Sequence, residues 1–131
     1  ARRRELPPRS CPAPAAATHP LPGARFTPLA TPSPGPVETA VWRVEIEPGT
    51  SPSPHSLTRE EVIVVLEGTA SVEIGGVAAT ATAGDAIAVP PETAFVLSNA
   101  GRSTLCLLCC LPVGGQARMG EGEPFTPPWA L

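Results

Sequence analysis

The sequence predicts an all-β fold, a sandwich or barrel built from short strands. Turn signals rich in glycine, proline and asparagine recur about every eight to twelve residues, a spacing typical of such folds. Apolar and polar side chains alternate over several segments, as expected for strands with one buried face. No segment has a convincing helical period. A chain of 131 residues is the length of one domain.

Proline separates the chain into parts. Ten of the nineteen prolines fall within residues 1–36, and only two lie between His55 and Leu111. Because proline lacks the N–H that a central strand must donate, it is kept out of sheet interiors. Residues 1–36 are therefore predicted to form an extended, proline-rich N-terminal arm outside the sheet interior.

The strands are predicted between the arm and a Gly/Pro-rich tail at residues 113–131. Residues 37–47 alternate between apolar and charged side chains, which indicates a half-buried strand. Residues 62–66 and 105–111 are apolar throughout, so both of their faces should be covered. Gly75-Gly76 predicts a hairpin turn. The remaining predicted strands cover residues 62–66, 69–74, 77–82, 86–89, 95–98 and 103–111.

Two glycine-bounded patterns carry the residues from which function can be inferred. The first is G-x5-H-x-L-x3-E-x6-G, formed by Gly49, His55, Leu57, Glu61 and Gly68. The second begins about fifteen residues later and contains Gly84, Pro90, Glu92, Phe95 and Asn99. They resemble the two motifs of the cupin superfamily, G-x5-H-x-H-x3-E-x6-G and G-x5-P-x-G-x2-H-x3-N.

The resemblance covers residues 37–112 and implies a double-stranded β-helix, the jelly-roll cupin barrel, whose interior can hold a small ligand. It divides the chain into an arm at 1–36, a barrel at 37–112 and a tail at 113–131.

The resemblance also implies a site for a divalent metal, although the ligand set departs from the family pattern. His55 and Glu61 match two metal ligands, whereas Leu57 and Phe95 replace the two remaining histidines and cannot coordinate a metal. Two alternatives follow: no cofactor, or a weakly bound Fe, Mn, Ni or Zn ion. Candidates for a third ligand are His19, Cys106 and Cys110.

The same residues predict a pocket for a small molecule. Side chains at even spacing along a strand share a face, so His55, Leu57 and Glu61 should enter one interior. Glu61 needs a partner there, and a metal, His55 or Arg43 could provide one. An apolar pocket with a few polar groups is typical of small-molecule sites. The predicted lining is His55, Leu57, Glu61, Ile63, Val65, Phe95 and Leu97.

Three functions agree with these residues. The preferred one is a cupin that binds a small, partly apolar molecule without redox chemistry. The alternative is a cupin enzyme, an isomerase, cyclase, decarboxylase or metal-dependent dioxygenase, in which His55 and Glu61 act as acid and base or hold the metal. The third is a structural cupin without a ligand.

Composition narrows the partners and the compartment. The net charge is −3 and all nine basic residues are arginine, which argues against a nucleic-acid surface. No apolar stretch is long enough to span a membrane, and prolines replace the apolar core of an export signal, so a cytoplasmic protein is expected. Cys106, Cys109 and Cys110 cluster in one apolar run and are predicted to be thiols. The outer faces of the doubly apolar strands need cover, which the arm, the Phe125–Trp129 tail or a second subunit could supply. Because cupins often pair through such sheets, the resemblance favours a homodimer.

Overall fold

The computed structural model of the chain describes residues 19–33, 38–50 and 52–131. Within them the predicted all-β fold is confirmed, and the one helix is a single 3-10 turn. No helix among these residues is long and apolar enough to cross a membrane. The elements are β1 (His19–Leu21), β2 (Ala24–Ala30), β3 (Thr39–Ile46), β4 (Ser56–Leu57), β5 (Glu61–Glu67), β6 (Thr69–Ile74), β7 (Val77–Thr82), β8 (Ala86–Val89), β9 (Phe95–Asn99), β10 (Leu105–Pro112), β11 (Ala117–Arg118) and η2 (Pro128–Ala130).

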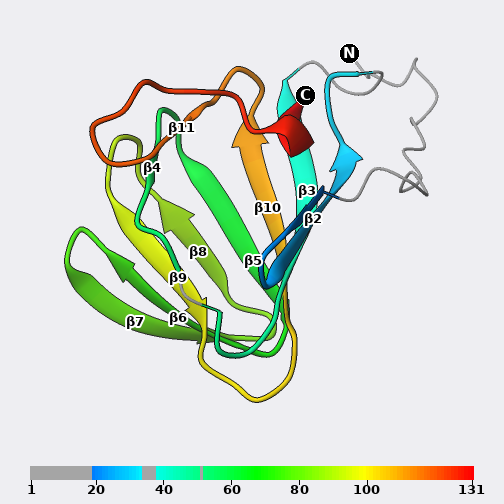
Figure 1. Cartoon of the computed structure of the whole chain (residues 1–131), viewed down its shortest axis with the longest axis vertical. Helices are drawn as coiled ribbons and strands as arrows, with labels where there is room; N and C mark the ends of the chain where they lie inside the picture. Colours follow the sequence, from blue (N-terminus) through cyan, green and yellow to red (C-terminus); the bar gives the residue numbers. More distant parts are fainter. Residues whose placement is uncertain (1–18, 34–37, 51) are drawn as a thin grey trace, which may run out of the picture.

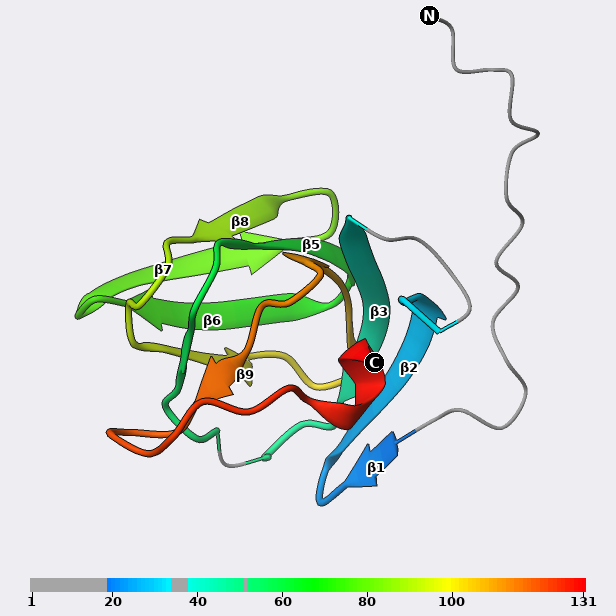
Figure 2. The same ribbon diagram turned by 90° about the horizontal axis from the view of Figure 1, so that it is seen from above.

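The strands form two layers that face each other (Figures 1 and 2). The larger sheet has six strands in the order β1-β2-β3-β10-β5-β8, and a smaller sheet has the order β7-β6-β9. A two-stranded β11-β4 pair continues the smaller sheet, because a bridge between His55 and Phe95 connects β9 to the segment that enters β4. All pairings within these sheets are antiparallel, as the jelly-roll architecture requires.

The core lies between the layers, and β10 shows how the sequence fills it. Leu105, Leu107 and Leu111 are buried on its inner face, together with Cys109, whereas the residues between them are only half-buried. This period of two is that of a strand with one face in the core. The inner faces of both sheets join one hydrophobic cluster that includes Leu57 and Phe95.

Most predicted strands are confirmed. Those at 69–74, 77–82 and 86–89 match β6, β7 and β8 at both ends. The others differ by one or two residues at an end, as expected where a turn begins.

The predicted exclusion of residues 1–36 from the sheet interior is wrong for the described part of that segment, because β2 lies between β1 and β3. Residues 19–21 and 24–30 form β1 and β2, and β2 pairs with β3. Proline is tolerated in β2 because β1 pairs only with residues 24–26, so Pro28 has a neighbouring strand on one side alone. Residues 1–18 and 34–37 lie outside the described residues.

The C-terminal segment folds back onto the larger sheet. Trp129 in η2 stacks on Phe26 of β2, with ring centroids 3.9 Å apart and an interplanar angle of 16°. Figure 2 shows η2 beside β2 and β3 of the larger sheet. The aromatic pair therefore covers apolar surface of these two strands.

Two residues of the motifs have structural roles. Gly68 adopts φ +92°, and a Cβ there would lie 3.1 Å from the Leu105 Cα, so a side chain at this turn would clash with β10. The Asn99 side chain donates to the carbonyls of Ile46 (2.9 Å) and Ser103 (2.8 Å) and accepts from the Gly101 N–H (2.8 Å). Asn99 therefore holds the β9–β10 loop against the end of β3.

Glu92 occupies the glycine position of the second motif and keeps the backbone conformation of a glycine. Its φ is +54°, and it is the one non-glycine residue with positive φ among the described residues. Its N–H donates to the Leu57 carbonyl at 2.7 Å, which ties the β8–β9 loop to β4. A left-handed conformation costs a residue with a Cβ about 1–2 kcal/mol.

Glu92→Gly should therefore stabilise the protein. Relief of the left-handed strain exceeds the entropy that glycine loses on folding, and we expect a net gain of about 0.5–1 kcal/mol in the free energy of unfolding. Urea denaturation measures it. Glu92→Ala is the control: it removes the 3.9 Å ion pair with Arg118 but keeps the strain, and should not stabilise. Equal stability of the glycine and alanine variants would contradict this explanation.

Candidate functional site

His55 lies at the edge of the smaller sheet, on the same face as Phe95. The two residues are directly opposite: the His55 N–H donates to the Phe95 carbonyl at 3.1 Å, and the Phe95 N–H donates to the His55 carbonyl at 2.8 Å. Opposite residues of an antiparallel pair project to one side. Their rings are 4.4 Å apart between centroids, and Phe95 is only 3% exposed. The half-buried imidazole therefore borders the core.

The imidazole is held as a neutral tautomer with one free nitrogen. Its Nδ1 lies 3.2 Å from the Ser53 carbonyl, which accepts only, so Nδ1 carries the hydrogen. Burial lowers the pKa of His55, and the hydrogen bond to Ser53 opposes that shift only in part. Nε2 then keeps a lone pair, and no described residue donates a hydrogen bond to it. That lone pair is available to a ligand.

Glu61 begins β5 on the inner face of the larger sheet. It shares strand parity with Ile63 and Val65, and the three side chains are 5%, 2% and 0% exposed. Its register partner on β8 is Val89, which is also fully buried. The carboxyl group thus enters the interior from a strand that is otherwise apolar.

The Glu61 carboxyl has no partner among the described residues: neither a hydrogen bond nor an ion pair to it is found there. Every fully buried nitrogen or oxygen of a described side chain has a hydrogen-bond partner. Because the Glu61 oxygens have no such partner, they are not fully buried, and they border space that water can reach. Burial raises the pKa of Glu61 to about 8, so the carboxyl is predominantly uncharged at neutral pH and can donate a hydrogen bond.

The apolar residues predicted to line the site lie on three strands of the two layers. Leu57 of β4 is 4% exposed, while Ile63 and Val65 belong to β5. Phe95 and Leu97 share the inner face of β9, opposite Ile74 and Val72 of β6. Leu57 and Phe95, at the two motif positions that lack histidine, are part of the core.

The described residues do not fit a divalent metal. No group of three or more His, Cys, Asp or Glu side chains comes together among them. His55 and Glu61 supply two donors, whereas a catalytic metal generally has three protein ligands and an open position. The metal site that the sequence resemblance implies is therefore not assembled by the part of the chain that the structure describes.

Several predicted partners lie elsewhere. Cys106 and Cys110 do share a face of β10, but it is the outer one, opposite Glu45 and Val41 of β3. Arg43 is exposed on that outer face, so it does not reach Glu61. His19 is on β1 and contacts Trp129, with ring centroids 6.3 Å apart. Among the described residues Glu61 also forms no ion pair or hydrogen bond with His55.

The thiol that lies in the interior is Cys109, whereas the sequence suggested Cys106 and Cys110 as possible ligands. It is buried between Trp42 on β3 and Ile63 on β5, its register partners. Burial, followed by the nearby Glu61, raises the pKa of Cys109 well above the usual thiol range. The thiol therefore stays protonated beside the carboxyl. Leu105, Leu107 and Leu111 share the parity of Cys109, but Leu108 has the other one, so the sequence alone does not tell which face of this apolar run is internal.

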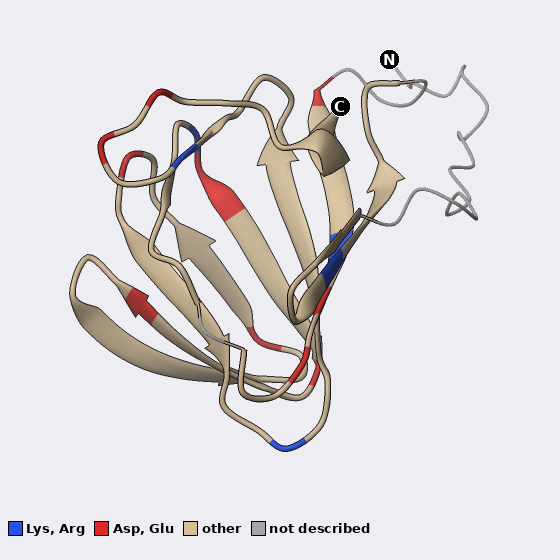
Figure 3. Cartoon of the chain, in the orientation of Figure 1, with Lys and Arg blue, Asp and Glu red and all other residues tan. Residues whose placement is uncertain are grey.

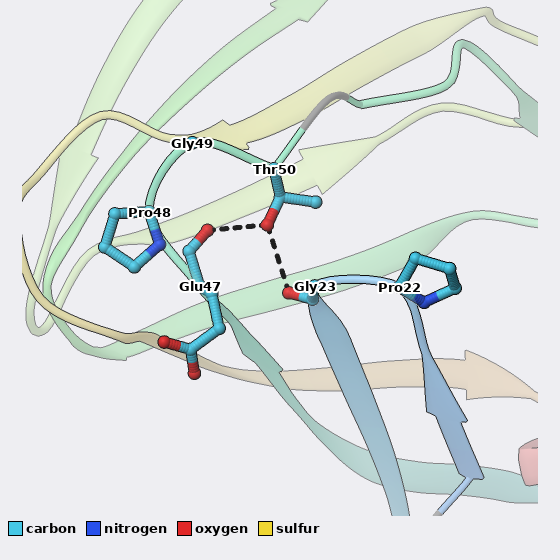
Figure 4. A pocket seen from close by; sticks show the side chains of 6 residues that line it. All are labelled: Pro22, Gly23, Glu47, Pro48, Gly49 and Thr50. Carbon is cyan, nitrogen blue, oxygen red and sulfur yellow. Dashed lines mark hydrogen bonds between the residues drawn. The ribbon is translucent and has the colours of Figure 1, made fainter.

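A separate surface hollow involves the motif residue Gly49 (Figure 4). It has a volume of about 420 Å³ and is lined by Pro22, Gly23, Glu47, Pro48, Gly49 and Thr50. The Thr50 hydroxyl lies 2.7 Å from the Glu47 carbonyl and 3.1 Å from that of Gly23. These contacts fasten the β1–β2 turn to the loop after β3. None of the predicted ligand-binding residues lines this hollow.

Comparison with solved structures identifies the fold. A variant of the salicylate 1,2-dioxygenase of Pseudoaminobacter salicylatoxidans, in complex with gentisate, has a TM-score of 0.66 and 19% identity, and the match covers 86% of this chain but only 31% of that one. A cupin-like protein of Thermotoga maritima has a TM-score of 0.67 and 24% identity over 74% of this chain and 75% of its own. KdgF of a Halomonas species has a TM-score of 0.62 and 22% identity over 72% of this chain and 84% of its own.

No curated protein matches the chain. The cupin domain family matches residues 42–111, more than half of the chain and most of the predicted barrel. With the two-layered fold and both glycine-bounded motifs in place, this match shows that the chain belongs to the cupin family.

Proposed function

We propose that this cupin binds a small, partly apolar molecule inside the barrel, against His55 and Glu61 and without a tightly held metal. The observation that carries the proposal is the Glu61 carboxyl, which is 5% exposed and unpartnered among the described residues. Burying a polar group without a partner is costly, so a ligand or water must satisfy it. The apolar residues around it match the usual lining of a small-molecule site.

Acid–base catalysis is a second candidate function, because the protonation states of Glu61 and His55 suit an acid and a base. Glu61 can donate a proton, while His55 Nε2 can accept one. An isomerase or cyclase needs such a pair within reach of one substrate. Similar folds include an oxalate decarboxylase of Lactobacillus farciminis, at 24% identity, which establishes the shared fold alone.

Binding inside the barrel predicts which methyl groups respond to a ligand. In a ¹H–¹³C methyl spectrum, titration with neutral and charged aromatic or alicyclic fragments should shift the signals of Leu57, Ile63, Val65 and Leu97 in a saturable way. Val77 is the internal control, because it is 71% exposed on β7 and should not move. If no fragment shifts the interior methyls saturably, the proposal is wrong and the barrel is structural.

The buried Glu61 predicts that stability decreases as pH rises. The carboxyl keeps its proton in the folded protein up to about pH 8, whereas the unfolded chain loses it near 4.5, so folding becomes less favourable between these values. From pH 6.5 to 8.5 we expect a loss of about 2 kcal/mol, at a rate of about 1.4 kcal/mol per pH unit below the folded pKa. Urea denaturation at both pH values measures it.

Glu61→Gln is the matched control for this pH dependence. Glutamine resembles the uncharged carboxyl in shape, and the variant should lose much less stability over the same range. Burial is the largest cause of the shifts at Cys109, Cys110 and His55 and is common to both proteins, so the difference between the two profiles reports the Glu61 carboxyl and its smaller effect on the two thiols. Identical pH profiles would show that Glu61 is ionised when folded.

The missing histidines predict that a metal site can be created. Wild-type protein should retain little nickel, zinc or manganese, whereas Leu57→His combined with Phe95→His should take up about one equivalent. Elemental mass spectrometry measures the metal. The double variant should lose about 2–5 kcal/mol of stability as apoprotein, part of which the metal restores. Stoichiometric, EDTA-resistant metal in the wild type would contradict a metal-free site.

We further propose a homodimer formed by the outer face of the larger sheet. Across this face Val62 pairs with Cys110 and Val64 with Leu108, all half-buried, and Cys110 pairs in turn with Val41. An apolar sheet face of this kind is typical of an interface. Polar residues border it: Arg43 is exposed, and Glu45 pairs with Arg25 of the same chain at 2.9 Å.

Disruption of this face should convert dimer to monomer. Leu108→Glu places a charge in its centre and should halve the mass measured by light scattering at micromolar concentration. Val77→Glu, an equally drastic change at an exposed position on the other sheet, should leave the dimer intact. A monomeric wild type would contradict the proposal.

A further inference from the structure

Among the described residues, the interior of the barrel holds polar groups but no positively charged side chain. The strands from β5 to β10 contain no Lys or Arg at all, as Figure 3 shows. The arginines of the described residues lie on outer faces or in exposed loops: Arg25, Arg43, Arg59, Arg102 and Arg118. This part of the chain therefore places no cation in the interior with which a negatively charged ligand could pair.

Arg118 is the arginine closest in register to the site, and it projects away from it. It pairs with Ser56, whereas the adjacent Ala117 pairs with Leu57, and both members of this second pair are buried. Because neighbouring residues of a strand project to opposite faces, Arg118 lies on the outer face. There it contacts the Gly122 carbonyl at 3.2 Å.

We propose that the ligand is an uncharged molecule that carries a hydrogen-bond acceptor and a donor on an apolar body. This inference rests on the proposed binding function and deepens it. The ligand's acceptor would receive a hydrogen bond from the Glu61 carboxyl, which is buried and unpartnered among the described residues. The ligand's donor would bond to the free Nε2 of His55, because Nδ1–H already donates to the Ser53 carbonyl.

Anions and cations fit the interior less well, for different reasons. A carboxylate ligand loses its hydration on entry, finds no arginine from residues 19–33, 38–50 or 52–131, and presents only acceptors to the lone pair of His55. An ammonium ligand would require the Glu61 carboxyl to ionise in apolar surroundings, where Ile63, Val65 and Val89 are its neighbours. A primary amide supplies both hydrogen bonds without a charge.

Isosteric probes test the charge preference directly. Benzamide and benzoate have nearly the same shape, as do cyclohexanecarboxamide and cyclohexanecarboxylate, and benzylamine supplies the cation. Each is titrated at pH 7 into the full chain, with the interior methyl signals as the readout and Val77 as the internal control. We expect each amide to bind at least tenfold more tightly than its carboxylate, and more tightly than benzylamine.

Two variants identify the groups that recognise the amide. Glu61→Gln keeps an uncharged donor at the same place and should preserve the preference for the amides. Glu61→Leu removes the donor and should weaken amide binding at least tenfold while leaving the fold intact, as judged by the methyl spectrum of the free protein. Unchanged amide affinity in Glu61→Leu would overturn the role assigned to the carboxyl.

The outcomes separate this inference from the proposed function. Saturable interior shifts with a carboxylate or with benzylamine, at equal or higher affinity than the amides, would overturn the uncharged ligand but support a binding barrel. No saturable shift with any of the five probes would overturn both.

Discussion

The hydrogen-bonded ladder that pairs β10 with its two neighbouring strands is the constraint on which the structure depends. This strand pairs with β3 along its whole length and with β5 on its other side, so it fixes the position of both strands in the larger sheet. Its alternating burial decides which face of all three strands points into the barrel. Because the register is shared, Glu61 must enter the interior on the same face as Ile63 and Cys109.

The same ladder explains why the site has an unusual chemical character. A carboxyl placed on the inner face of an apolar sheet has apolar neighbours such as Val89 and Ile63 and no positive charge among the described residues, and it remains uncharged because ionisation there is costly. The His55 imidazole, on the opposing layer, is neutral for a related reason. The interior thus combines a donor and an acceptor with an apolar lining, an arrangement suited to molecules without net charge.

The motif positions separate into those that shape the backbone and those that carry chemistry. Gly68 and Asn99 maintain turns, and position 92 keeps a positive φ although it is no longer glycine. At two of the chemical positions, Leu57 and Phe95, apolar side chains have joined the core, and no group of three or more potential metal ligands comes together among the described residues. The positions that shape the backbone depend on steric limits, which apply whether or not a metal binds.

The sequence by itself determined the all-β class, the barrel strands and the placement of His55 and Glu61 within the motifs. Strand periodicity, glycine turns and motif spacing are local properties, so they can be read without the fold. The sequence did not reveal that β2 is a strand, because the many prolines of residues 1–36 argued against one. Pro28 is tolerated in β2 because only β3 pairs with this strand at that position.

Only the tertiary structure decided which face of β10 is internal, and therefore that Cys109 rather than Cys106 or Cys110 is buried in the interior. It also decided that Arg43 projects outward and that Glu61 has no partner among the described residues. The reason is physical: strand parity divides side chains into two sets, but which set is buried depends on the strands that pack across the barrel.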